Sequence, residues 1–187
     1  TTKNVVCKTI REKLPDLKFG CCMNPEFLRE GRAVFDFMNP DRIVIGTADA
    51  HAADVMHNLY AGIDAPVLDV EPTAAEMIKY TSNALLAAKI SFANEIGNLC
   101  KKLGVDVYEV MKGVGMDSRV SPKFLNAGAG FGGSCFPKDV SALADIIRKE
   151  NLEPVFLDAV LKVNDLQPLR MIALLEEKIG SLAGKRI

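Results

Sequence analysis

The sequence predicts an α/β fold in which the trailing part of a parallel sheet is followed by a mainly helical region with one long helix. Over residues 1–72, short apolar runs alternate with helical stretches. After that, apolar residues recur at steps of three and four for about thirty residues, the spacing of one helix face. Of the 187 residues, 49% are hydrophobic and 25% are charged, so the chain can bury a core.

The first region alternates helices with strands. Helices are expected over Thr2–Leu14 and Asp49–Tyr60. Strands are expected at the apolar runs Phe19–Met23, Arg42–Gly46 and Pro66–Val70. Short loops between such elements are typical of a parallel sheet covered by helices. Because the chain opens directly into a helix, we expect residues 1–72 to be the trailing part of a doubly wound domain whose leading part lies outside this sequence.

A single long helix is expected from Thr73 to Leu103, and Gly104 then ends it. Its main apolar stripe consists of Leu85, Ala88, Phe92, Ile96, Leu99 and Leu103. About thirty residues make roughly 45 Å of helix, more than one small domain needs. Such a helix is typical of a subunit interface, so we expect a homodimer formed through residues 73–103.

The rest of the chain reads as helices joined by a glycine-rich loop, forming a helical domain over residues 73–180. Asp106 and Glu109 form a capping pair for a short helix that ends near Gly113. The expected elements that follow are a loop at Asn126–Ser134, a helix at Lys138–Lys149, a helix at Pro154–Ile179 and a linker at 181–187. Pro168 should kink or split the last helix.

Composition argues against several classes of protein and site. The formal charge is −1 with both signs interspersed, which gives no basic stripe for a nucleic acid. No apolar run is long enough to span a membrane and the start has no export signal, so the cytoplasm is the expected location. Five cysteines without a C-x-x-C pair favour free thiols in a reducing compartment over disulfides or zinc, and no metal site is expected.

Gly128, Gly130 and Gly133 satisfy the pattern G-x-G-x-x-G. That pattern binds a dinucleotide only where a strand leads into it and a helix leaves from its last glycine, and Ser121–Ala127 is no convincing strand. Two interpretations remain open from spacing alone. Backbone without side chains lets a sugar or pyrophosphate approach closely, or the segment is simply a flexible loop.

The segment around Cys135 carries a candidate nucleophile. Ser134 or Cys135 can cap the following helix and Pro137 suits its first turn, which places the thiol at the positive end of a helix dipole. This environment favours the thiolate form of a cysteine. Lys138 adds a cation, and Asp139 faces the same side four residues on. The alternative is a capping residue that happens to be cysteine.

Two further groups could assist such a nucleophile. Lys79 and Asn83 are four residues apart on one helix face, and an ammonium and an amide aimed together suit an oxyanion. Glu26 and Glu30 follow an apolar run, at the position where α/β sheets hold ligands, and could act in acid-base work. A solvated helix face and an ordinary acidic helix start are the competing explanations.

Together these segments resemble the UDP-glucose/GDP-mannose dehydrogenase family. The matching motifs are NPEFLREG at 24–31, NPDR at 39–42, AEMIKY at 75–80 with Asn83, Asn94-Glu95, GMDSR at 115–119 and GFGGSCFPKD at 130–139. The resemblance implies a three-part enzyme. An N-terminal Rossmann-type domain binds NAD, a helical central domain dimerises and a C-terminal domain helps to bind the nucleotide sugar, so residues 181–187 would lead into that last domain.

The resemblance also implies a role for each candidate residue. Cys135 would be the nucleophile with Asp139 as its companion, and Lys79 and Asn83 would position the oxyanion and water. Glu26 would act in general acid-base catalysis, and either Glu26 or Asp139 could activate the water. Glu30, Cys135 and Lys138 would contact NAD. The substrate contacts would be Phe27, Leu28, Arg29, Glu30, Arg119, Asn126, Phe131 and Gly132, with Arg119 reaching into the neighbouring subunit's site.

The implied reaction is oxidation of the UDP-glucose C6 alcohol to UDP-glucuronate by two hydride transfers to NAD, through a cysteine thiohemiacetal and thioester. GDP-mannose is the alternative substrate. In family members the cofactor-binding glycines and a catalytic threonine precede the position of Thr1, so this chain alone is expected to be inactive. A non-catalytic helical dimerisation module and a cysteine hydrolase using Cys135, Lys79 and Glu26 are the other classes considered.

Overall fold

The computed structural model describes residues 1–186, which form two compact units divided between Thr81 and Ser82. The division falls inside one helix, α4 (Pro72–Leu103), so this helix contributes to both units. Ile187, the last residue of the predicted linker, lies outside the described residues.

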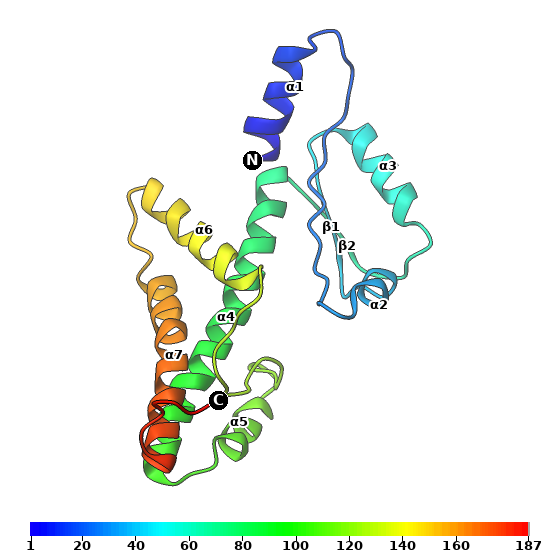
Figure 1. Cartoon of the computed structure of the whole chain (residues 1–187). Helices are drawn as coiled ribbons and strands as arrows, with labels where there is room; N and C mark the ends of the chain where they lie inside the picture. Colours follow the sequence, from blue (N-terminus) through cyan, green and yellow to red (C-terminus); the bar gives the residue numbers. More distant parts are fainter. Residues whose placement is uncertain (187) are drawn as a thin grey trace. The chain divides into compact units, whose positions relative to one another are not determined.

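The first unit is built on two parallel strands (Figure 1). Its elements are η1 (Thr2–Cys7), α1 (Lys8–Lys13), α2 (Ala33–Met38), β1 (Ile43–Gly46), α3 (Ala50–Tyr60) and β2 (Val67–Val70). Ile43 pairs with Val67, and the register continues to Gly46 opposite Val70. Every residue of β1 is buried, as expected for a strand of a parallel sheet. The predicted fold class and the strands at Arg42–Gly46 and Pro66–Val70 are therefore confirmed.

Two features of this unit differ from the sequence-based expectation. Phe19–Met23 is extended but is not a strand, because only Met23 pairs, in an isolated antiparallel bridge to Gly46. Helix α2 was not expected at all. Its side chains have no clear apolar face, since Val34, Phe35, Phe37 and Met38 are all exposed.

The expectation that all five cysteines are free thiols is wrong for two of them. Cys7 and Cys21 form a disulfide although they lie 14 residues apart in sequence. The chain turns back after α1, which brings their Cα atoms to 6.7 Å. Cys22, Cys100 and Cys135 are free. The sequence argument failed here because cysteine count and spacing do not specify which chain segments meet.

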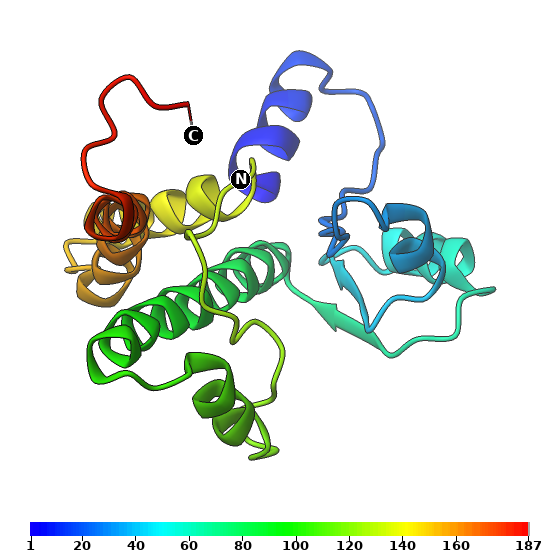
Figure 2. The same cartoon turned by 60° about the horizontal axis from the view of Figure 1, so that its bottom comes forward.

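The second unit surrounds the rest of α4 with three helices (Figure 2). These are α5 (Val107–Gly115), α6 (Phe136–Lys149) and α7 (Val155–Ile179). In both views α5 and α7 lie on different sides of α4. The helices confirm the predicted order of elements, and Asp106 caps α5 by accepting from the Tyr108 N–H. A split at Pro168 is wrong, because α7 continues through it.

Helix α4 packs through small side chains. Ala84, Ala87, Ala88 and Ala93 are buried, and small residues allow neighbouring helices to approach closely. Leu85, Phe92, Leu99 and Leu103 of the predicted stripe are instead 52 to 66% exposed. Among the helices of residues 1–186, none combines the length and the apolar character needed to cross a bilayer.

Candidate active site

The loop at residues 24–30 is fixed at its start by backbone groups of β1 and by a side chain of α3. Met23 exchanges two backbone hydrogen bonds with Gly46, both at 2.8 Å. Asn24 then donates to the Val44 carbonyl at 2.8 Å and accepts from the Tyr60 hydroxyl at 2.6 Å. The loop therefore starts beside Gly46, at the end of β1, and is held there by hydrogen bonds.

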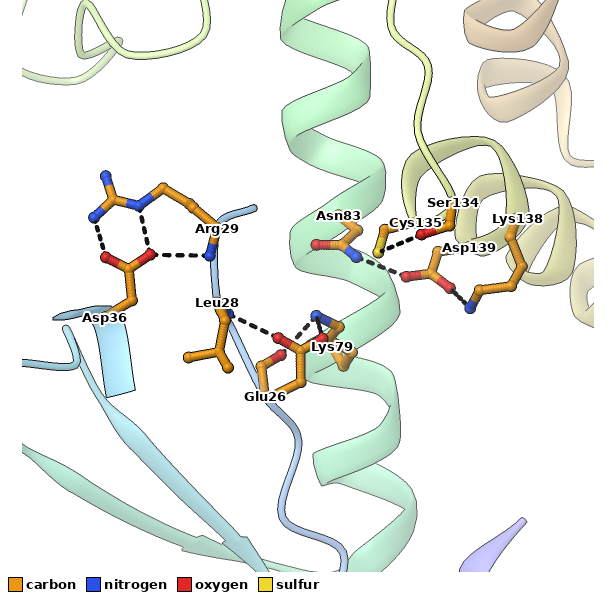
Figure 3. A network of polar contacts seen from close by, with 10 residues as sticks. All are labelled: Glu26, Leu28, Arg29, Asp36, Lys79, Asn83, Ser134, Cys135, Lys138 and Asp139. Atoms are coloured by element: carbon orange, nitrogen blue, oxygen red, sulfur yellow. Dashed lines mark hydrogen bonds and ion pairs between the residues drawn. The ribbon is translucent and has the colours of Figure 1, made fainter. Parts of the chain in front are cut away.

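Lys79 of α4 binds this loop at Glu26 (Figure 3). Its Nζ donates to the Glu26 carbonyl at 2.6 Å and to the Glu26 carboxylate at 2.9 Å. The second carboxylate oxygen accepts from the Leu28 N–H at 2.7 Å. The Lys79 side chain is only 17% exposed whereas that of Glu26 is 55% exposed. The structure thus brings together two of the predicted catalytic residues.

The middle of the loop is held by aromatic and ionic contacts. The Arg42 guanidinium lies 3.9 Å from the centre of the Phe27 ring, a cation-π contact. Arg29 donates its backbone N–H and its side chain to Asp36 of α2. These hydrogen bonds from the Arg29 side chain lower the pKa of Asp36 from 3.8 to about 2. The loop, α2 and residues 39–43 line a hollow of about 230 Å³.

Cys135 is the residue immediately before α6, and its thiol is exposed. Its Sγ lies 3.6 Å from the Ser134 hydroxyl oxygen. Pro137 occupies the first turn, as the sequence predicts, but the expected cap is wrong, because neither Ser134 nor Cys135 forms a side-chain capping hydrogen bond at the start of α6. The helix starts at Phe136, two residues earlier than expected. The thiol is therefore presented to solvent at the positive end of a 14-residue helix.

Asp139 is the buried carboxylate of this group, with 3% of its surface exposed. It accepts a hydrogen bond from Asn83 Nδ2 at 2.6 Å, and Lys138 forms an ion pair with its other oxygen (Figure 3). Its backbone N–H donates to the Cys135 carbonyl at 2.8 Å. Asn83 and Lys79 lie one turn apart on α4, yet Lys79 binds Glu26 and Asn83 binds Asp139.

The predicted substrate residues of the second unit have differing environments. Asn126 and Gly132 are exposed on the glycine-rich loop, whereas the Phe131 ring is buried and packs edge-on against Phe136 at 6.0 Å. Arg119 is 87% exposed and pairs with Asp117. That hydrogen bond from Arg119 lowers the pKa of Asp117 below its usual value.

Sequence reasoning missed two residues that support these loops. Asp36 binds Arg29, and the signal available was an acid within a short apolar segment, FDFM. Lys89 of α4 donates to the carbonyls of Val120 and Ser121 at 3.0 and 3.1 Å. Ser121 has a φ of 65°, unusual for a residue other than glycine, but nothing in the local sequence indicates that conformation.

A metal site or another free thiol would be an alternative reactive centre. Among the residues that the structure describes, no group of three or more His, Cys, Asp or Glu side chains is arranged to hold a metal ion. Of the other free cysteines, Cys100 is buried, and burial raises the pKa of the Cys22 thiol. The segment before Gly128 is irregular, so the glycine pattern there lacks the strand of a dinucleotide fingerprint.

Comparison with protein families gives two matches that together cover most of the chain. Residues 1–64 match the NAD binding domain of the UDP-glucose/GDP-mannose dehydrogenase family, and residues 73–166 match the central domain of the same family.

Individual relatives agree with these matches. UDP-glucose 6-dehydrogenase AglM of Haloferax volcanii is 48% identical over 88% of this chain and 39% of its own length. UDP-glucose 6-dehydrogenase YwqF of Bacillus subtilis is 43% identical over 100% of this chain and 42% of its own. The chain thus spans about two fifths of the length of these curated relatives.

Solved structures show the same similarity. A UDP-glucose dehydrogenase from Pyrobaculum islandicum superposes with a TM-score of 0.94 at 48% identity, covering 96% of this chain and 42% of the other. A GDP-mannose dehydrogenase from Pseudomonas aeruginosa superposes with a TM-score of 0.61 at 38% identity, covering 93% of this chain and 41% of the other.

Proposed function

This chain belongs to the UDP-glucose/GDP-mannose dehydrogenase family, and on that premise we propose that its protein oxidises the C6 alcohol of UDP-glucose to the carboxylate of UDP-glucuronate, with NAD as oxidant. The observation that carries the proposal is the exposed Cys135 thiol at the start of α6, one turn before the buried Asp139. A thiol in this position suits a covalent intermediate at the aldehyde level of oxidation.

UDP-glucose is proposed ahead of GDP-mannose on the strength of the relatives. The curated proteins at 43 to 48% identity are named UDP-glucose 6-dehydrogenases. The GDP-mannose dehydrogenase of known structure is less similar in both sequence and fold, with 38% identity and a TM-score of 0.61.

The residues present fit a cofactor that carries negative charge. The first turn of α6 has no side-chain cap, and the Lys138 side chain beside it is 66% exposed. The positive end of a helix and an ammonium both suit phosphate oxygens. We assign Glu30, Cys135 and Lys138 as its contacts in this chain. When bound, NAD accepts one hydride in each of the two oxidations.

Cys135 acts on the carbon that is oxidised. Its thiolate attacks the C6 aldehyde and forms a C–S bond, giving a thiohemiacetal. Loss of a hydride from this carbon converts the thiohemiacetal to a thioester. Water then adds to the thioester carbonyl, the C–S bond breaks and the thiol is regenerated. One water is consumed and two molecules of NADH form per sugar.

The polar side chains near Cys135 and Glu26 have different proposed roles in these steps. Lys79 supplies positive charge for the C6 oxygen, and loss of one such donor typically costs about 2.7 to 4 kcal/mol in the barrier. Glu26, whose carboxylate is 55% exposed, is the proposed base for the attacking water. Asp139 is buried and bonded to Asn83, so the proposed role of this pair is to orient water and the thiol rather than to exchange protons with solvent.

The substrate contacts proposed in this chain are Phe27, Leu28, Arg29, Glu30, Arg119, Asn126, Phe131 and Gly132. Phe131 would act by shaping the loop, since its ring is buried. Arg119 is the proposed contribution to a neighbouring subunit, because its side chain is 87% exposed. The exposed stripe of Leu85, Phe92, Leu99 and Leu103 is the proposed homodimer contact.

The test is an assay of the intact protein on UDP-glucose and on GDP-mannose, with NADH counted against sugar consumed. We expect turnover of UDP-glucose with two NADH per sugar. A preference for GDP-mannose would reassign the substrate, and inactivity on both would refute the proposal. Turnover of an amide or nitrile without NAD would instead favour a cysteine hydrolase.

A further inference from the structure

The glycine-rich loop is bound by side-chain carboxamides from two helices. Asn94 of α4 accepts the Gly128 N–H through Oδ1 at 2.6 Å. Gln167 of α7 donates its Nε2 to the Gly128 carbonyl at 2.7 Å. Both backbone polar groups of this glycine are thus satisfied by side chains that lie far away in sequence.

The same pattern recurs three residues along the loop. Asn164 of α7 accepts the Phe131 N–H at 2.7 Å and donates to the Phe131 carbonyl at 3.0 Å. These two hydrogen bonds resemble those between paired strands, with the amide side chain of Asn164 in place of the second strand. Asn98 of α4 donates to Gln167 at 2.8 Å and so orients its amide.

Two of these carboxamides, those of Asn94 and Gln167, are buried far more deeply than is usual for polar side chains. Asn94 has 0% of its surface exposed and Gln167 has 1%. Burying an amide is unfavourable unless its hydrogen bonds are made, so an apolar residue would fill either position more simply. Asn94 Nδ2 has no partner within the described part of the chain. Packing alone therefore does not explain amide side chains at these positions. An irregular loop does explain them, because its backbone N–H and C=O groups need hydrogen-bond partners.

Gly130 fits closely against this cluster. It has a φ of +109°, and a Cβ added there would lie 2.8 Å from Asn164 Oδ1. Only glycine allows the loop to adopt this conformation and to approach the asparagine so closely. The close contact between the loop and Asn164 therefore depends on glycine at position 130.

From these contacts we infer that Asn94, Asn164 and Gln167, the carboxamide cluster, are positioning residues for binding of the nucleotide sugar. The inference rests on the proposed function, in which Asn126 and Gly132 of this loop contact the sugar. The cluster fixes Phe131, whose ring packs against Phe136, the residue that follows Cys135. The position of the loop is thereby fixed relative to Cys135. Small displacements of substrate-binding groups relative to a nucleophile greatly reduce the rate of catalysis.

The experiment compares Asn164→Leu and Gln167→Leu with the wild type in the intact protein. Both changes keep the approximate shape and remove the hydrogen bonds to the loop. We expect KM for UDP-glucose to rise by about tenfold to a hundredfold while KM for NAD changes by less than about twofold. A matched control is Ser91→Ala, which removes a buried 2.9 Å hydrogen bond between α4 and the Val160 carbonyl of α7 without touching the loop. It should lower the stability and leave both KM values unchanged.

A second readout follows the loop itself through hydrogen exchange. The amides of Gly128 and Phe131 should be protected in the wild type, and Asn164→Leu should expose that of Phe131. Gly130→Ala should reproduce this loss, and adding Asn164→Leu to it should add little, because both changes break the same contact.

The outcomes separate the two ideas. Unprotected wild-type amides, or exposure of Phe131 with an unchanged KM for UDP-glucose, would overturn the positioning role. An equal rise in both KM values, or a rise in Ser91→Ala as well, would reduce the cluster to a structural one and would also overturn it. If the wild-type amides are protected but the protein oxidises no nucleotide sugar, the proposed function is refuted instead. The carboxamide cluster would then bind the loop without a role in substrate binding.

Discussion

Asn83 Nδ2 donates to Asp139 Oδ2 at 2.6 Å, joining α4 to the first turn of α6. Both side chains are buried, with 8% and 3% of their surfaces exposed. The bond lies one helical turn from Cys135, so it links the stability of the second unit to the placement of the candidate nucleophile.

Asn83→Ala should destabilise the protein by about 1 to 3 kcal/mol, because it removes a partner from a buried carboxylate. Chemical denaturation measures the change. Lys138→Ala is the matched control, since it removes the other partner of Asp139 from a side chain that is 66% exposed. It should cost less than about 1 kcal/mol. Equal costs for the two variants would contradict this view of the pair.

The contact between Arg29 and Asp36 should make stability depend on acid pH. The pKa of Asp36 falls from 3.8 in the unfolded chain to about 2 in the folded one, so the folded state favours the ionised carboxyl. Its contribution is complete above pH 3.8 and is lost as the pH falls towards 2. Asp36→Asn should therefore lower the denaturation midpoint more at about pH 6 than at about pH 3. A pH-independent difference between variant and wild type would argue against the assignment.

Phe92→Glu should weaken the proposed homodimer. The Phe92 side chain lies at the centre of the exposed α4 stripe and is 52% exposed, and a carboxylate buried there would lack a partner. Analytical ultracentrifugation should show a dimer for the wild type and a monomer for the variant. Leu152→Glu, at an apolar residue that is 64% exposed and lies between α6 and α7, should remain dimeric. A monomeric wild type would disprove the interface.

Lys89→Met should loosen the segment that carries Arg119. It removes two hydrogen bonds to the carbonyls of Val120 and Ser121 and keeps an apolar stem of similar length. We expect a loss of about 1 kcal/mol in stability and a rise in KM for UDP-glucose. Lys102→Met, at an exposed lysine near the end of the same helix, is the control. If the two variants behave alike, the bonds from Lys89 have no role in the segment.

The sequence predicted those helices and strands that are determined by the spacing of apolar residues within the segment itself. The long helix follows from apolar residues at helical spacing, and β1 follows from the run Ile43–Gly46, which is buried throughout. The run Phe19–Met23 is also apolar, but a strand needs a neighbour to pair with, and within this run only Met23 finds one. Helix α2 could not be recognised because its apolar side chains, such as Val34, face solvent.

For the candidate site too, features set by local sequence were predicted and contacts between distant segments were not. Pro137 in the first turn of α6 was predicted from the sequence, and Cys135 does precede this helix, although it forms no side-chain capping hydrogen bond. The partners of these residues depend on the fold. Nothing local indicates that Lys79 binds Glu26, 53 residues away, or that Asn83 binds Asp139, 56 residues away. The amides that bind the glycine-rich loop were missed as a group for the same reason.

The most direct test of the account is Cys135→Ser in the intact protein, assayed for UDP-glucuronate with UDP-glucose and NAD. A serine hydroxyl stays protonated at neutral pH and is a far weaker nucleophile than a thiolate, so neither the thiohemiacetal nor the thioester should form. The account predicts that no acid is produced although the folded protein still binds both substrates. Acid production at the wild-type rate would contradict it.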